Sequence, residues 1–264
     1  MGGDGCGPGA GLRYEARRVA DFLVEAASDG IIVLTGAGIS TASGIPDFRS
    51  PGSGLWERID PMEAMSLASF ERDPAAFYRL ALASWLPPLL GAQPNAAHLA
   101  LARLEVAGLI RGVITQNIDG LHQAAGSRAV LEIHGNVQHV ECRRCGYRGE
   151  APPLGTERET ELPPLCPLCH APLKPGIVLF GEQMPPAFYE ALALAQECAA
   201  MIVIGSSLQV APAAYLPELA RRLVVNNLQP TPFDTVAELV VPLPAQELWP
   251  EVVAELAERG LVSQ

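Results

Sequence analysis

A short apolar run followed at once by a long glycine-rich segment constrains the fold of this chain more than any other feature. Residues 31–34 are apolar and mostly β-branched, which is typical of a buried strand. A glycine-rich turn directly after such a strand lets the backbone come close to a phosphate-bearing ligand. Within residues 36–49, however, Gly44 comes six residues after Gly38, so this is not the usual helix-opening G-x-G-x-x-G fingerprint. The spacing indicates a specialised dinucleotide loop, which would deliver into one pocket Asp47, Phe48 and Arg49.

Strands and helices alternate along most of the chain. Short apolar segments at 112–115, 201–204 and 223–225 predict further strands, and the segments between them show helical spacing of apolar residues. Polar or glycine clusters follow directly after several strand ends. This pattern predicts an α/β fold, a doubly wound parallel Rossmann-like sheet that binds its ligand at the carboxyl edge of the strands.

Two units are expected to interrupt this core. The strand pattern is lost at about 50–95, where the sequence predicts a helical insertion. At about 137–175, proline, glycine and cysteine residues predict a small metal-binding module. We expect residues 12–264 to form a single domain with a discontinuous core. Residues 1–11 are glycine-rich, without the basic start or apolar stretch of a secretory signal, and are expected to be a flexible leader.

Composition and charge exclude several classes of protein. The apolar fraction of 49% is ordinary for a globular protein, and no segment approaches the roughly 18 apolar residues of a membrane helix. The net charge of −11 argues against nucleic acid as a partner. That charge would suit a basic peptide, and an acidic surface that only keeps the protein soluble explains it equally well. We therefore expect a cytoplasmic protein with no nucleic-acid or membrane partner, and a monomer is the default expectation.

Four of the six cysteines form two C-x-x-C pairs with twenty residues between the pairs: Cys142, Cys145, Cys166 and Cys169. Four thiolates at this spacing suit one tetrahedral zinc ion. A complete sulfur shell leaves no open position for catalysis, so the zinc would be structural. A disulfide framework is not expected in a chain of this size without an export signal. The open alternatives are a redox C-x-x-C motif and reduced bystander thiols.

Three polar clusters at predicted strand ends are candidate ligand sites. Residues 116–119 could bind a ligand or could only form an Asx turn. Residues 205–207 offer amide and hydroxyl donors to a phosphate or ribose, and a plain helix N-cap is the competing interpretation. His134 stands at another strand end, where a single histidine is usually structural. An imidazole nevertheless titrates near neutral pH, as a general base should.

Taken together, these motifs resemble the sirtuins, the NAD-dependent protein lysine deacylases, of the bacterial and archaeal type. The resemblance covers about residues 12–255. It rests on Gly-Ala-Gly-Ile-Ser with Gly-Ile-Pro-Asp-Phe-Arg, Thr-Gln-Asn-Ile-Asp, His-Gly-Asn, the four cysteines, Phe-Gly-Glu and Gly-Ser-Ser, all in the family's order. It implies a deacetylase that transfers the acetyl group from a protein or peptide lysine to ADP-ribose and releases nicotinamide and O-acetyl-ADP-ribose. NAD would be the co-substrate, and one zinc ion per chain would be structural.

The resemblance also implies roles for single residues. His134 would take a proton from a ribose hydroxyl, which then attacks the alkylamidate formed when the acetyl oxygen displaces nicotinamide. Asn117 and Asp119 would hold the nicotinamide ribose and carboxamide, where polar and anionic groups stabilise the developing positive charge. Phe48 would keep water from the reactive ribose. The implied cofactor-binding residues are Gly36, Ala37, Gly38, Ile45, Asp47, Phe48, Arg49, Gln116, Asn117, Ile118, Asp119, Gly205, Ser206, Ser207 and Asn227.

Substrate recognition is implied by two further segments. Residues 177–180 predict a strand. In sirtuins the matching segment pairs its backbone with an extended peptide, and a plain core strand is the alternative. The residues concerned are Val178, Phe180, Gly181 and Glu182. Sirtuins that prefer succinyl or malonyl groups carry Tyr-x-x-Arg in the helical insertion. Here Ala81 stands three residues after Tyr78, so that cation is missing and a neutral acyl group is expected.

Three other functions remain as alternatives. A mono-ADP-ribosyltransferase would share the first bond cleavage, but His134 and the peptide-pairing segment favour the deacetylase. A non-catalytic NAD or ADP-ribose sensor is disfavoured by the intact His134, Asn117 and Asp119. A zinc ribbon for nucleic acid is disfavoured by the acidic charge and the long α/β pattern.

Overall fold

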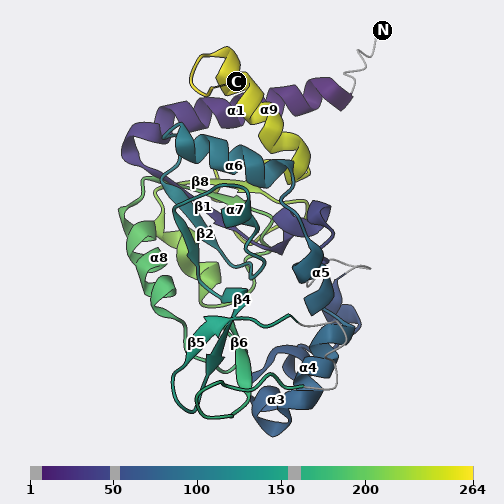
Figure 1. Cartoon of the computed structure of the whole chain (residues 1–264). Helices are drawn as coiled ribbons and strands as arrows, with labels where there is room; N and C mark the ends of the chain where they lie inside the picture. Colours follow the sequence, from purple (N-terminus) through teal and green to yellow (C-terminus); the bar gives the residue numbers. More distant parts are fainter. Residues whose placement is uncertain (1–7, 48–53, 154–161, 264) are drawn as a thin grey trace.

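The structure is a computed structural model that describes residues 8–47, 54–153 and 162–263 (Figure 1). Among these residues, six parallel strands form the central sheet in the order β3-β2-β1-β7-β8-β9. The predicted α/β fold with a doubly wound parallel sheet is therefore confirmed. The strands are β1 (Ile31–Thr35), β2 (Gly112–Thr115), β3 (Val130–Glu132), β7 (Ala200–Ile204), β8 (Arg222–Asn226) and β9 (Leu239–Val240).

The order of the strands reverses between β1 and β7, the two central strands. Every residue of both strands is buried, as expected for a parallel sheet that is covered on both faces. A crevice forms beyond the carboxyl ends of the strands at such a reversal. Gly36 and Gly205 directly follow these two strands. The topology thus brings the two predicted glycine loops to the same crevice.

Helices cover both faces of the sheet (Figure 1). On one face, α1 (Pro8–Ala26), α6 (Ala96–Val106) and α9 (Ala245–Glu258) pack against each other and against the strands. On the other face lie α8 (Pro186–Glu197) and the 3₁₀ segment η5 (Ala213–Leu219). Among the helices of the described residues, none is both long enough and apolar enough to span a bilayer.

Helix α1 includes the end of the segment that the sequence predicts to be a flexible leader. It starts at Pro8, so residues 8–11 of the expected leader are helical, while residues 1–7 lie outside the described part of the chain. Proline is tolerated in the first turn of a helix, because its missing N–H would have no helical partner there. Ala16, Val19 and Leu23 then form a buried stripe that holds the helix on the sheet.

The helical insertion lies between the 3₁₀ segment η2 (Ala37–Ser43) and α6. It begins with the 3₁₀ segment η3 (Leu55–Glu57) and contains α2 (Pro61–Met65), α3 (Leu67–Arg72), α4 (Pro74–Ala83) and α5 (Leu86–Gly91). Side chains that accept a hydrogen bond from the first turn cap three of these short helices, namely Asp60, Ser66 and Asp73.

A second, antiparallel sheet carries the cysteines. It consists of β4 (Gly135–Cys142), β5 (Arg148–Glu150) and β6 (Leu173–Ile177) in the order β5-β4-β6. The short helix α7 (Leu121–Ala124) and β3 precede it in the chain. Strand β6 ends at Ile177, so the predicted strand at 177–180 is wrong. The chain turns instead, because Gly181 adopts a φ of +92°, which favours glycine.

Candidate active site

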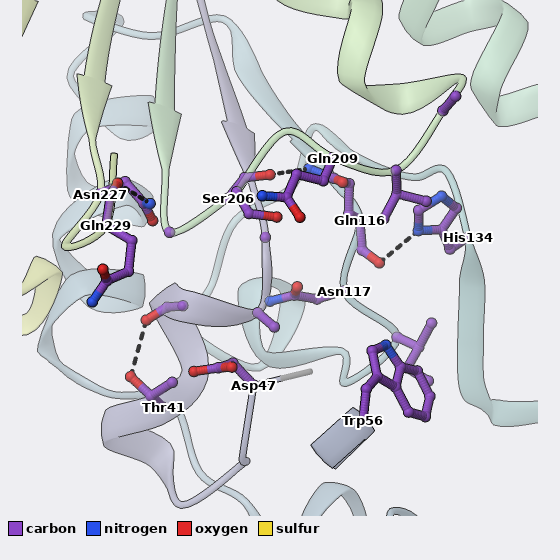
Figure 2. A pocket seen from close by; sticks show the side chains of 18 of the residues that line it. Thr41, Asp47, Trp56, Gln116, Asn117, His134, Ser206, Gln209, Asn227 and Gln229 are labelled. Carbon is purple, nitrogen blue, oxygen red and sulfur yellow. Dashed lines mark hydrogen bonds between the residues drawn. The ribbon is translucent and has the colours of Figure 1, made fainter. Parts of the chain in front are cut away.

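A cavity of about 670 Å³ lies at the carboxyl edge of the main sheet (Figure 2). Its walls include the two glycine loops, the helical insertion, the residue that precedes β4 and the turn after β6. Most of the predicted site residues line it: Gly36, Ala37, Gly38, Asp47, Gln116, Asn117, Ile118, His134, Val178, Phe180, Gly181, Glu182, Gly205, Ser206, Ser207 and Asn227.

Among the described residues of the predicted cofactor and peptide sites, two do not lie on this wall. Ile45 is buried in the apolar core of the helical insertion, where it packs instead of lining the cavity. Asp119 is buried behind the wall, where it accepts a hydrogen bond from Ser40. Phe48 and Arg49 lie outside the described residues. The expectation that Ile45 faces the ligand therefore differs from its position in this structure, because its apolar side chain is drawn into the adjacent core.

The two glycine loops touch each other at the base of the cavity. The backbone N–H of Gly36 donates to the carbonyl oxygen of Ile204 at 3.0 Å, and that of Gly38 donates to the carbonyl oxygen of Gly205 at 2.8 Å. A Cβ atom on Gly38 would come within 2.8 Å of the Gly205 backbone, and Gly205 itself has a φ of +62°. Only glycine permits this approach, which keeps the backbone of both loops open to a ligand.

A buried serine connects the polar residues behind the cavity. The hydroxyl of Ser40 donates to Oδ2 of Asp119 at 2.8 Å and accepts from Nδ2 of Asn117 at 3.1 Å. The other carboxylate oxygen, Oδ1, accepts from the N–H of Leu121 at 2.9 Å. Burial raises the pKa of Asp119, and its hydrogen bonds with Leu121, Ser40 and Asn117 oppose that rise. Ser40 thus links Asn117, which lines the cavity, to the carboxylate behind it.

His98 completes this buried network from the other side. Its Nδ1 accepts from the N–H of Asn95 in the capping box of α6, which places the ring proton on Nε2, 3.4 Å from the hydroxyl of Ser40. Burial lowers the pKa of His98 to about 4, so the ring is neutral. Sequence reasoning missed both Ser40 and His98. The available signals were a serine inside the glycine-rich segment and an Asn-x-x-His helix start.

His134 lies in the cavity wall with a defined tautomer (Figure 2). Its Nδ1 is 2.9 Å from the carbonyl oxygen of Gln116. Because a carbonyl oxygen only accepts, Nδ1 carries the proton, and Nε2 is the unprotonated nitrogen. Burial lowers the pKa of His134, and the hydrogen bond to Gln116 partly offsets that effect. At neutral pH the site therefore holds a neutral imidazole with one basic nitrogen.

Amide and hydroxyl side chains line the cavity beyond His134, with Asn227 at the far end. Nε2 of Gln116 donates to the hydroxyl of Ser206 at 2.9 Å, and Nδ2 of Asn227 donates to the carbonyl oxygen of Gln229 at 2.7 Å (Figure 2). This end offers donors and acceptors to a sugar or a base without a charged side chain. Lining residues that sequence reasoning did not identify include Thr41, Trp56, Met65, Gln209, Gln229 and Gln246.

The turn after β6 forms a further part of the cavity wall. The N–H of Val178 donates to the carbonyl oxygen of His134 at 2.8 Å, which ties this turn to the histidine. Phe180 forms a bridge with the insertion, since its N–H donates to Met65 O at 2.8 Å and its carbonyl accepts from Leu67 N at 3.0 Å. The turn thus joins the antiparallel sheet to the helical insertion.

The four predicted cysteines come together at one end of the antiparallel sheet. Their sulfur atoms all lie within 4.8 Å of one another, with Cys142 and Cys169 3.5 Å apart and Cys145 and Cys166 3.6 Å apart. A disulfide bond would need about 2.05 Å, so these are free thiols. A shell of four sulfurs fits one tetrahedral zinc ion, and it leaves no open coordination position for catalysis.

Tyr78 and Ala81 do not face the cavity. The Tyr78 hydroxyl donates to the carbonyl oxygen of Leu173 at 3.0 Å, and both side chains are buried in the core of the insertion. Burial raises the pKa of Tyr78. An arginine placed at 81 would therefore enter an apolar core instead of meeting a substrate. Among the described lining residues there is no lysine or arginine.

Comparisons with known proteins agree with this geometry. The protein-family model described as Sir2 family matches residues 36–212. NAD-dependent protein deacetylase 2 of Caldanaerobacter subterraneus subsp. tengcongensis is 48% identical over 215 residues, which cover 81% of this chain and 86% of that protein.

Two solved structures are similar over nearly their whole length. One holds a Sir2 variant with a deacetylated p53 peptide and 3′-O-acetyl ADP-ribose; its TM-score is 0.84 at 41% identity, covering 94% of this chain and 99% of that chain. The other holds Sir2 with a p53 peptide and NAD⁺; its TM-score is 0.79 at 41% identity, covering 93% and 98%.

Proposed function

This chain belongs to the Sir2 family, and on that premise we propose that it is an NAD-dependent protein lysine deacetylase. It transfers the acetyl group of an acetylated lysine to ADP-ribose and releases nicotinamide, free lysine and O-acetyl-ADP-ribose. The observation that carries the proposal is that a single cavity contains the two glycine loops, His134 and the turn at 178–182. A dinucleotide on one wall and a peptide side chain on the other can reach the same imidazole.

NAD binds along the carboxyl edge of the sheet in this proposal. The contact between the loops at Gly38 and Gly205 supports a pyrophosphate position there, because both backbones stay unobstructed by side chains. Ser206 and Gln116 are positioned for a ribose, and Asn227 for the second ribose at the far end. The similar solved structure with NAD⁺ and a p53 peptide supports the same pair of ligands.

Cleavage of the nicotinamide–ribose bond is assigned to the polar network around Ser40. Positive charge develops on the ribose as this bond breaks, and prearranged dipoles and anions stabilise such charge in a site that excludes water. Asn117 lines the cavity, and Ser40 holds its amide and the Asp119 carboxylate in one arrangement. The acetyl oxygen attacks the ribose carbon while the bond electrons leave with nicotinamide.

His134 then acts as the general base. Its unprotonated Nε2 accepts the proton of a ribose hydroxyl, whose oxygen attacks the acetyl-derived carbon. The hydrogen bond from Nδ1 to Gln116 stabilises the imidazolium that results. The imidazolium returns its proton to the lysine nitrogen, which leaves the acetyl-derived carbon as the free amine, and one water molecule adds to that carbon to give O-acetyl-ADP-ribose. The lowered pKa of His134 keeps the ring in its basic form at neutral pH.

The four cysteines would hold the zinc ion of this family, and the zinc would stabilise the antiparallel sheet and supply no reaction step. A mono-ADP-ribosyltransferase would use the same bond cleavage but would pass the ribose to a protein side chain. The position of His134 beside the peptide-facing turn favours the deacetylase.

The proposal is tested by incubating the protein with NAD and an acetyl-lysine peptide and following the products by mass spectrometry. We expect equal amounts of deacetylated peptide, nicotinamide and O-acetyl-ADP-ribose, and no product without NAD. With His134→Ala, the deacetylated peptide and O-acetyl-ADP-ribose should form at least about 100-fold more slowly. Accumulation of ADP-ribose on a protein side chain, with the peptide still acetylated, would contradict the deacetylase and favour the transferase.

A further inference from the structure

The turn at 178–182 is closed by a single side chain. The N–H of Glu182 donates to the carbonyl oxygen of Leu179 at 3.0 Å, and in return Oε2 of Glu182 accepts from the N–H of Leu179 at 2.9 Å. The Glu182 side chain is only 11% exposed. Its carboxylate therefore folds back inside the turn that lines the cavity, and its position sets the position of the backbone at 179–182.

Lys174, the only lysine of the chain, forms an ion pair with this carboxylate. Its Nζ lies 3.0 Å from Oε2 of Glu182 and 3.1 Å from Oε1 of Glu141, and it donates to the carbonyl oxygens of Pro175 and Ile177. The Lys174 side chain is 1% exposed. Such a buried ammonium fixes the positions of the groups that accept from it. Moving one of these carboxylates away from the ammonium would leave a buried charge without its partner, which is energetically costly.

Arg143 holds the same carboxylate from the metal-binding module. It lies between Cys142 and Cys145, and its Nη1 donates to Oε1 of Glu182 at 2.9 Å. Its Nε lies 3.4 Å from a carboxylate oxygen of Glu71 in α3 of the insertion. Both oxygens of Glu182 are thus held by cations that belong to the cysteine-bearing sheet.

We propose that Lys174 and Arg143 are positioning residues for the acyl-peptide substrate, which act by fixing Glu182 and, through it, the turn at 178–182 that pairs with the peptide. The inference rests on the proposed function. It assigns to the cysteine-bearing module a role in substrate binding, because Arg143 lies in the loop between Cys142 and Cys145. NAD binding, which uses the glycine loops, does not depend on the two cations.

The test compares variants in the full-length, zinc-loaded protein. We expect Lys174→Met to raise the KM and Kd for an acetyl-lysine peptide by about tenfold or more, with the Kd for NAD changed by less than about twofold. Lys174→Arg keeps a cation and should restore most of the peptide affinity. Hydrogen exchange of the amides at 178–182 should speed up in Lys174→Met while the metal content stays at one zinc per chain.

Arg144 provides a matched control for the second cation. Arg144 has the same charge as Arg143, lies in the same loop between Cys142 and Cys145, and is exposed. Arg143→Gln should weaken peptide binding and speed up exchange at 178–182, whereas Arg144→Gln should leave both as in the unsubstituted protein. Equal behaviour of these two variants would overturn the proposal. If Lys174→Met does not yield folded protein, the comparison of Arg143→Gln with Arg144→Gln still tests the proposal.

Failure of this inference and failure of the proposed function give different results. If the unsubstituted protein produces no O-acetyl-ADP-ribose, the proposed function fails, while the exchange rates at 178–182 still test the positioning role. If the unsubstituted protein is active but Lys174→Met binds peptide normally, or loses NAD and peptide binding equally, the positioning role is wrong and the proposed function stands.

Discussion

The imidazole rings of His98 and His122 lie edge to face behind the glycine loop, with their centroids 5.0 Å apart and their planes at 63°. Nε2 of His122 lies 2.9 Å from the hydroxyl of Thr35, which itself donates to Thr115, so Nε2 carries the proton. Nδ1 of His122 is buried and has no partner among the described residues. Both rings are therefore neutral members of the polar layer beneath the active site.

The histidine pair should make stability depend on pH. Burial lowers the pKa of His98 to about 4, and burial together with His98 lowers that of His122 to about 3, against about 6.5 when unfolded. Between about pH 4 and 6.5 the unfolded chain binds more protons, so the free energy of unfolding falls as pH falls, by up to about 1.4 kcal/mol per pH unit for each histidine. Asp119, with its pKa raised by burial, contributes with the opposite sign.

Urea unfolding at a series of pH values between about 5 and 7 measures this effect. His122→Asn should unfold more easily at neutral pH but with a shallower pH dependence, since one titrating group is removed. An unchanged slope in this variant would show that His122 does not remain neutral in the folded protein.

The activity should decline on the acid side of its pH profile only below the ordinary pKa of histidine. The base must be neutral, and burial lowers the pKa of His134, so kcat/KM should stay near its plateau as pH falls to about 6.5 and should decline only below it. His134→Ala should reduce kcat by about 100-fold or more, with NAD affinity retained. A variant with nearly full activity would exclude His134 as the base.

Removal of one sulfur ligand should release the metal. Cys166 is fully buried, and Cys166→Ser is expected to lower the zinc content below one per chain and to reduce the melting temperature. Cys198 lies outside the cluster and provides the control, because Cys198→Ala should retain the zinc. Full zinc content in Cys166→Ser would contradict the four-cysteine site.

The cavity should favour neutral acyl groups. The acidic residues of its described wall are Asp47 and Glu182, and no lysine or arginine is found there. A succinyl group would bring an unpaired negative charge into this wall, so kcat/KM for a succinyl-lysine peptide should be at least about tenfold lower than for the acetyl-lysine peptide. Comparable values for the two peptides would reveal a cation that reaches the acyl group.

The protein itself should resist acylation at lysine. Its single lysine, Lys174, is 1% exposed and its ammonium is surrounded by acceptors. Treatment of the native protein with acetic anhydride should leave Lys174 unmodified in peptide maps, whereas the urea-unfolded protein should be acetylated there. Equal acetylation in the two states would show that the ion pairs open in solution.

Several parts of this structure follow from local sequence patterns. The strand at 31–35 with its glycine loop and the two C-x-x-C pairs consist of residues that are close along the chain, so their spacing alone predicts a strand end and a metal site. His134 is a candidate base chiefly through the resemblance of the surrounding motif to the family. Parallel strands end at one edge of a sheet, which is why the predicted loops meet in one cavity.

Other parts depend on contacts between segments that are far apart in the sequence, and no local pattern encodes them. Ser40 meets His98, 58 residues away, and the Tyr78 hydroxyl reaches Leu173, 95 residues away, which turns a residue expected near the substrate into part of the core. By itself, then, the sequence determined the α/β architecture, the family and about half of the described residues that line the cavity. The tertiary structure decided which buried side chains support those residues, because burial and hydrogen bonding select partners only once distant segments have packed together.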